Sequence, residues 1–99
     1  MLYAIIGRDA PGTRDKRTAV RPRHLERIDR LVAAGRLVAA GPFPAIDAAE
    51  PGPAGFAGSL IIAEFDSLAE ARAWAAADPY TVEGVYEHVD VHPYLKLRP

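Results

Sequence analysis

The chain has 99 residues, 49% of them hydrophobic and 25% charged, and a net charge of -1. This size and composition predict one globular domain over residues 1–99, and the lack of a basic excess argues against a nucleic-acid partner. With no cysteine, the chain has no disulfide, thiol nucleophile or thiolate metal site. The apolar start, residues 1–7, is too short to span a membrane and lacks signal-peptide features, so we expect a cytoplasmic protein without a membrane partner.

The first half of the chain predicts a strand, a helix and a second strand. Residues 2–7 are apolar and favour β-structure, and the polar residues 8–18 predict a loop. A helix is expected over residues 22–34, because Pro22 suits a first turn and Gly35 is a natural stop. Its apolar positions recur at helical spacing: Leu25, Ile28, Leu31 and Val32. Residues 37–43 predict the second strand, followed by a proline- and glycine-rich turn segment over 44–55.

The second half repeats the pattern in the order strand, helix, strand. Residues 59–65 form the strongest strand signal and are expected to pair with 37–43 as a long hairpin. Ser67 and Glu70 have the spacing of a capping box, which predicts a helix running from there to Asp78-Pro79. After a turn around Gly84, residues 86–91 alternate between polar and apolar, as a half-exposed strand does.

This element order predicts a ferredoxin-like α+β sandwich of βαββαβ type. Both helices would then cover one face of a four-stranded antiparallel sheet. The other face would have no helical cover, and an open apolar face on so small a domain is commonly buried against a second copy. We therefore expect a homodimer.

His24 and Asp78 are the main candidates for catalysis. On a helical wheel at about 100° per residue, His24 lies within roughly 40° of Ile28 and Leu31, on the face turned toward the sheet. Pro79 ends the helix and fixes Asp78 at its exit, where the helix dipole disfavours a carboxylate unless a donor or cation compensates. The imidazole of His24, if it lies nearby, would be such a donor or cation. Taken singly, His24 also fits a neutral core histidine, and Asp78 also fits a residue of a helix-ending turn.

Three further residues are weaker candidates. Ser59 would direct a hydroxyl toward the same cleft, although strand-edge serines are commonly only solvated. Tyr80 would shape a pocket wall or offer a phenol, with simple packing as the alternative. Arg17, Arg21, Arg23 and Arg27 suggest an anion-binding site, but a solvated charged face accounts better for Arg23 and Arg27. Only Arg21 is retained as a substrate-binding candidate, because it is expected beside the start of the first helix, near His24.

No metal or cofactor is expected. His88, Asp90 and His92 share one face of the last strand, but the two histidines would lie about 13 Å apart at about 3.3 Å per residue. That separation is too large for both to bind one zinc ion. The sequence also contains neither a G-x-G-x-x-G nor a Walker pattern, which argues against a nucleotide cofactor.

Several short segments, taken in order, resemble the YciI-like (YCII-related) family over essentially the full chain. They are Arg21-Pro22-Arg23-His24-Leu25, Gly35, Gly41-Pro42, Gly58-Ser59, Asp78-Pro79-Tyr80 and Gly84. The resemblance implies a dimeric α+β barrel similar to muconolactone isomerases and to a dehydrochlorinase of chlorinated hydroxyquinols. It also implies a catalytic dyad of His24 and Asp78, with Ser59 as a third member. The proline-rich segment 44–55 departs from the family's pattern as an insert that would reshape the mouth of the cleft.

Two classes of function follow from these residues. The first is a cofactor-independent enzyme in which His24 acts as general acid or base on a small cyclic or aromatic substrate. Asp78 would fix the tautomer of the imidazole, and Ser59 would hold a substrate oxygen. The reaction would be an isomerisation or an elimination. The alternative is a non-catalytic dimeric module that binds a small molecule or a partner protein, and a ligand-sensing accessory domain is a third option.

Overall fold

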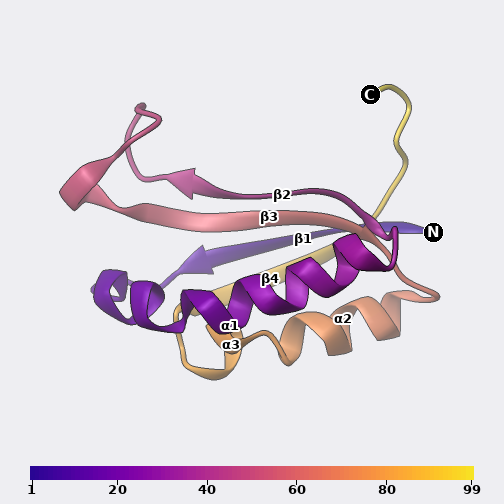
Figure 1. Ribbon diagram of the computed structural model, residues 1–99, viewed down its shortest axis with the longest axis horizontal. Helices are drawn as coiled ribbons and strands as arrows, with labels where there is room; N and C mark the ends of the chain where they lie inside the picture. Colours follow the sequence, from indigo (N-terminus) through magenta and orange to yellow (C-terminus); the bar gives the residue numbers. More distant parts are fainter.

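The computed structural model describes residues 1–99 as one sheet covered by helices on one face (Figure 1). Its elements in chain order are β1 (Leu2–Asp9), α1 (Arg14–Ala33), β2 (Leu37–Pro44), the short 3-10 turn η1 (Gly52–Ala54), β3 (Phe56–Glu64), α2 (Leu68–Ala76), α3 (Pro79–Val82) and β4 (Tyr86–Tyr94). No helix combines the length and the apolar character needed to cross a membrane.

The four strands form one antiparallel sheet in the order β2-β3-β1-β4. The two central strands are β1 and β3, and the ladder between them is regular. The β1–β4 ladder shifts register between Arg8 and Asp9, and the β2–β3 ladder shifts register near both of its ends. Figure 1 shows α1 and α2 side by side on the same face of this sheet. The predicted ferredoxin-like α+β fold is confirmed.

The core lies between the helices and the sheet. Buried side chains alternate along β1 and β3, as expected for strands with one covered face. The larger cluster consists of Tyr3, Ile5, Ile28, Leu31, Ile61, Ala63, Phe65, Ala71 and Ala75. A smaller cluster at the other end of the domain consists of Val20, Tyr80, Val85 and Tyr86. The helix-wheel expectation is confirmed in one respect, since His24 is buried on the face of α1 that also carries Ile28 and Leu31.

The first helix is longer than the sequence predicted. It begins at Arg14 and contains Pro22, whereas a loop was expected as far as residue 18 and Pro22 was expected in the first turn. Arginine, lysine and alanine between residues 14 and 21 favour a helix, whereas the loop prediction relied on the polar character of the segment. Pro22 cannot donate a hydrogen bond to the carbonyl of Thr18, yet the helix continues through it. Arg21 therefore lies in the middle of α1 rather than beside its start.

The second predicted helix is two helices. Ser67 caps α2 as expected, its hydroxyl accepting a hydrogen bond from the backbone N–H of Glu70 at 3.1 Å. However, α2 ends at Ala76, and the separate turn α3 begins at Pro79. Strands β3 and β4 also extend beyond their predicted bounds, because β3 begins at Phe56 and β4 continues to Tyr94. The break between α2 and α3 is what positions Asp78.

Candidate active site

His24 and Asp78 are in direct contact, although 54 residues separate them in the sequence. The Nδ1 atom of His24 lies 2.9 Å from each carboxylate oxygen of Asp78. Their side chains are only 6% and 3% exposed. Because an ionised carboxylate can only accept hydrogen bonds, this contact assigns the proton of the neutral ring to Nδ1. The contact leaves Nε2 as the nitrogen free to exchange a proton with a ligand.

Asp78 is held by the start of α3. Its Oδ1 atom accepts a hydrogen bond from the backbone N–H of Tyr80 at 2.8 Å, and Pro79 occupies the first helical position. The sequence placed this carboxylate at a helix C-terminus, where the dipole would oppose it. That expectation is wrong, because α2 has already ended and Asp78 caps the N-terminal side of the next turn, a position that favours a carboxylate.

Tyr80 packs flat against the imidazole. The ring centroids of His24 and Tyr80 lie 3.9 Å apart with their planes 17° apart, and Tyr80 is 1% exposed. Burial raises the pKa of the Tyr80 phenol, and the positive charges of Arg17 and Arg21 act in the opposite direction. The phenol therefore stays protonated near neutral pH and can donate a hydrogen bond.

Two polar atoms of this group are free of protein partners. The structure contains no buried side-chain nitrogen or oxygen without a hydrogen-bond partner. The His24 Nε2 and Tyr80 hydroxyl atoms make no hydrogen bond within the chain, although both residues are buried. It follows that these two atoms retain access to solvent, and both residues line the same cavity.

Arg17 is the site residue that the sequence interpretation missed. Its side chain is 8% exposed and its guanidinium is shared among several groups. Nη1 donates to both oxygens of Asp9 at 3.1 and 3.3 Å, and Nη2 donates to the hydroxyl of Ser59 at 2.6 Å. The guanidinium also lies over the Tyr80 ring, 4.7 Å from its centroid. The residue lies in the polar stretch that was predicted as a loop, and no sequence signal marked its partners.

Ser59 lies on the covered face of β3, inside the strand rather than at its start. It is 4% exposed, so the solvated alternative is wrong. Its hydroxyl accepts a hydrogen bond from Arg17. Burial raises the pKa of Tyr86, and the nearby Ser59 hydroxyl offsets this in part. The serine hydroxyl is thus oriented by the guanidinium of Arg17.

These side chains surround a cavity of about 630 Å³ between α1 and the β2–β3 half of the sheet. The cavity brings together four residues that the sequence singled out, His24, Ser59, Tyr80 and Arg21, while Asp78 lies behind His24. Gly52 and Gly55 also line it, so the 44–55 segment forms part of its wall. Its volume is in the range of about 300–1,000 Å³ that is usual for small-molecule sites.

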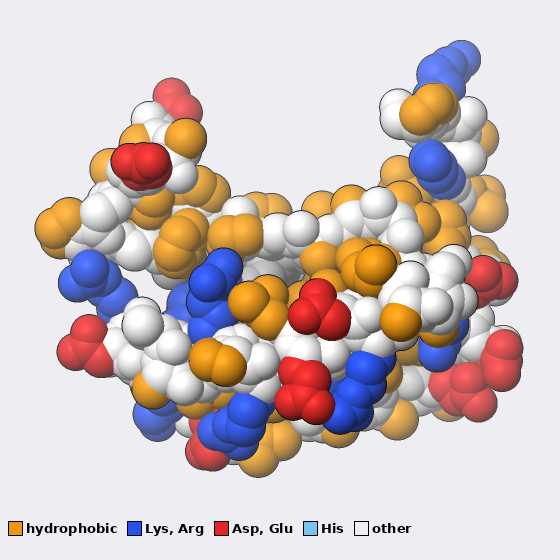
Figure 2. Space-filling model, in the orientation of Figure 1, with side chains coloured by type: hydrophobic (Ala, Val, Ile, Leu, Met, Phe, Trp, Pro, Cys, Tyr) orange, Lys and Arg blue, Asp and Glu red, His pale blue; other side chains and the backbone are white.

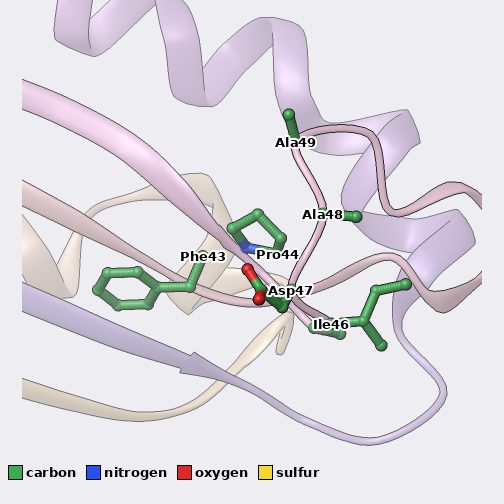
Figure 3. Close-up of a pocket in the computed structure, with 7 residues that line it drawn as sticks. Phe43, Pro44, Ile46, Asp47, Ala48 and Ala49 are labelled. Atoms are coloured by element: carbon green, nitrogen blue, oxygen red, sulfur yellow. The ribbon is translucent and has the colours of Figure 1, made fainter.

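A second hollow is lined by residues 43–49, at the end of β2 and in the segment that follows it (Figure 3). Its lining comes from one stretch of chain, and Asp47 is its only charged residue. None of the candidate site residues borders this hollow. It therefore offers no arrangement for acid/base chemistry.

His88, Asp90 and His92 of β4 do not gather around one point. His88 and Asp90 form an exposed pair, with Nε2 of the histidine 3.0 Å from Oδ1 of the aspartate. His92 makes no hydrogen bond with either residue. No group of three metal-binding side chains occurs in the structure.

The family of the chain follows from comparison with known proteins. A model of the YCII-related domain matches residues 1–95. The chain belongs to this family. It is 55% identical over 97 residues to Protein YciI of Escherichia coli O6:H1, an alignment that covers 98% of this chain and 99% of that protein. The two proteins are thus nearly equal in length.

One further relative and one solved structure are also similar to this chain. An uncharacterized protein of Haemophilus influenzae is 50% identical over 97 residues, covering 98% of this chain and 99% of that protein. Among solved structures, 5-chloro-2-hydroxyhydroquinone dehydrochlorinase (TftG) of Burkholderia phenoliruptrix AC1100, in complex with 2,5-dihydroxybenzoquinone, superposes with a TM-score of 0.83. It is 25% identical, and the match covers 96% of this chain and 94% of that one.

Proposed function

We propose that the protein is a cofactor-independent enzyme in which His24 moves a proton on a small cyclic or aromatic substrate. The observation that carries this proposal is the contact between His24 Nδ1 and Asp78, which leaves Nε2 open to the cavity. A base needs a free nitrogen within reach of the substrate and a partner that fixes its tautomer, and this pair provides both.

In the proposed reaction, Nε2 takes a proton from a carbon next to a carbonyl or an enol. The Asp78 carboxylate then faces an imidazolium and stabilises the charge that forms. For an isomerisation, the ring returns the proton to another carbon; for an elimination, the electrons of the broken C–H bond form a double bond and an anion such as chloride leaves. The Tyr80 and Ser59 hydroxyls would hold a substrate oxygen.

The similarity to the dehydrochlorinase supports this reaction class. That enzyme acts, by its name, on a chlorinated hydroquinone, and its structure contains a quinone. The two chains are 25% identical over 96% of this chain, and we extend the kind of substrate to this protein on that similarity. Lactones, enol-lactones and halogenated quinols are therefore the compounds to test.

The decisive experiment measures turnover of such a panel by the purified protein and by two matched variants. We expect His24→Gln and Asp78→Asn each to lower kcat by roughly 10² to 10⁴, the usual contribution of a positioned acid or base. His88→Gln is the control, because this histidine is exposed and outside the cavity. Turnover that survives His24→Gln would refute the role of the dyad.

We also propose that the protein is a homodimer joined through the uncovered sheet face. Alternation along β1 and β3 places half-buried apolar side chains there: Leu2, Ala4, Ile6, Leu60 and Ile62. A second copy would exclude water from this face. Analytical ultracentrifugation tests the proposal: the wild type should sediment as a dimer, and Ile62→Lys should sediment as a monomer. A monomeric wild type at high concentration would contradict it.

A further inference from the structure

The ionisable side chains with a basic group that line the cavity are three arginines and one histidine. Arg14, Arg17, Arg21 and His24 border it, and no aspartate or glutamate does, although the chain as a whole has a net charge of -1. These four residues follow one another at intervals of three or four along α1, so they share one face of the helix. Figure 2 shows basic side chains gathered where the surface is hollowed between α1 and the 44–55 segment.

Two of these side chains are paired within the protein and two are not. Arg17 is paired with Asp9, and His24 with Asp78. Arg14 and Arg21 form no side-chain hydrogen bond and no ion pair. Every other arginine of α1 has such a partner: Arg23 binds Glu83, Arg27 binds the Trp74 carbonyl, and Arg30 binds Glu26. The unpaired cations of this helix are thus the two that border the cavity.

The other end of the cavity is apolar. Beyond His24, the wall of α1 continues with Leu25 and Ile28, and the sheet contributes Leu37 and Ile61. His24 therefore lies at the boundary between a cationic half and an apolar half. At a rise of about 1.5 Å per residue, Arg21 is only about 4.5 Å from His24 along the helix axis, whereas Arg14 is about 15 Å away.

We infer that the cavity binds a small organic carboxylate, with its anionic group on Arg21 and its hydrocarbon or ring against Leu25 and Ile28. A cavity with a single sign of charge attracts a ligand of the opposite sign, and a guanidinium can bind a carboxylate through two parallel hydrogen bonds. Arg14, farther out, would draw the anion toward the mouth. This inference rests on the proposed function, since the atom next to the carboxylate would then face Nε2 of His24.

Ligand binding tests the inference and requires no turnover of substrate. It is measured by the NMR shifts of the protein's backbone N–H groups. The probes are three pairs of equal shape: benzoate and benzamide, cyclohexanecarboxylate and cyclohexanecarboxamide, 2-furoate and 2-furamide. We expect each carboxylate to bind at least roughly tenfold more tightly than its amide. The double variant Arg14→Gln/Arg21→Gln should lose this preference, and Arg30→Gln, which removes a charge from the same helix outside the cavity, should keep it.

Equal binding of acids and amides, no binding of any pair, or a preference that survives the double variant would each overturn the inference. These outcomes are separate from those of the proposed function. Turnover of neutral quinols that depends on His24, without a preference for carboxylates, would support the dyad and overturn the inference. Tight carboxylate binding that depends on Arg21, with no turnover of any compound, would support the inference and overturn the enzymatic role.

Discussion

The guanidinium of Arg17 lies 2.6 Å from the hydroxyl of Ser59 and joins helix α1 to strand β3 inside the protein. The same guanidinium holds the carboxylate of Asp9 at the end of β1. One buried side chain therefore connects a helix with both central strands beside the His24–Tyr80 stack. The geometry of the site depends on a residue that need not touch a ligand.

Removing Arg17 should destabilise the fold strongly. Arg17→Met leaves the carboxylate of Asp9, itself 7% exposed, without its partner, and breaking a buried pair in this way costs about 3–5 kcal/mol. Urea unfolding measures the loss. Arg30→Met is the control, since its pair with Glu26 is exposed and contributes about 0–1 kcal/mol. The double variant Asp9→Leu/Arg17→Met should recover part of the loss, and equal losses for Arg17→Met and Arg30→Met would contradict this account.

Gly58 is required by the close approach of two strands. A Cβ atom at this position would lie 2.0 Å from the carbonyl oxygen of Gly7, and backbone cannot move aside cheaply. We expect Gly58→Ala to lower the free energy of unfolding by at least about 1–3 kcal/mol, the usual cost of overpacking. Gly41→Ala is the matched control in β2, because nothing lies within 4 Å of its Cβ position. Similar melting temperatures for both variants would show that the strands can separate.

Stability should fall at alkaline pH because of two buried phenols. Burial raises the pKa of Tyr80 and of Tyr86 above the ordinary value of 10.0. In the unfolded chain these phenols ionise near pH 10, so the folded state binds more protons than the unfolded state as the pH rises above that value. Their contribution is therefore present below pH 10 and is lost as the pH rises through the raised pKa values. Urea unfolding between about pH 9 and 11 should show a shallower decline for Tyr86→Phe than for the wild type, and parallel slopes would disprove the assignment.

Asp78 has two separable roles. Asp78→Ala removes both the cap on the Tyr80 N–H and the partner of His24, and loss of such a cap alone costs about 0.5–2 kcal/mol. Asp78→Asn keeps an oxygen that can accept from the Tyr80 N–H, so it should unfold at a higher urea concentration than Asp78→Ala. Under the proposed function, we expect kcat to fall by roughly 10² to 10⁴ in both variants. If the two variants are equally stable, the cap contributes nothing.

The architecture was predictable because its signals are local. The apolar strand 59–65, the capping box at Ser67 and the stop at Gly35 each depend on nearby residues, and their order specifies the topology. The start of α1 was not predicted, because residues 8–18 lack apolar residues at helical spacing and Pro22 pointed to a first turn. The helix continues through Pro22, and nothing in the pattern of residues 14–21 indicates that it does.

The site was predictable only in part. The wheel placed His24 inward, but the distance between His24 and Asp78 depends on how α3 meets α1, which no local pattern specifies. Asp78 fits both of its interpretations, since it caps a turn and also binds the imidazole. Arg17 was missed because a buried cation is recognised by its partners, and Asp9 and Ser59 come from two different strands.

The dyad and the mouth of the cavity come from different parts of the chain. His24 and Asp78 are held between α1 and α3, whereas Gly52, Gly55 and Phe56 belong to the hairpin that joins β2 to β3. Sequence changes in this hairpin can alter which molecules enter without disturbing the contact between His24 and Asp78. Under the proposed function, relatives can therefore diverge in specificity through one surface hairpin while they retain the same dyad.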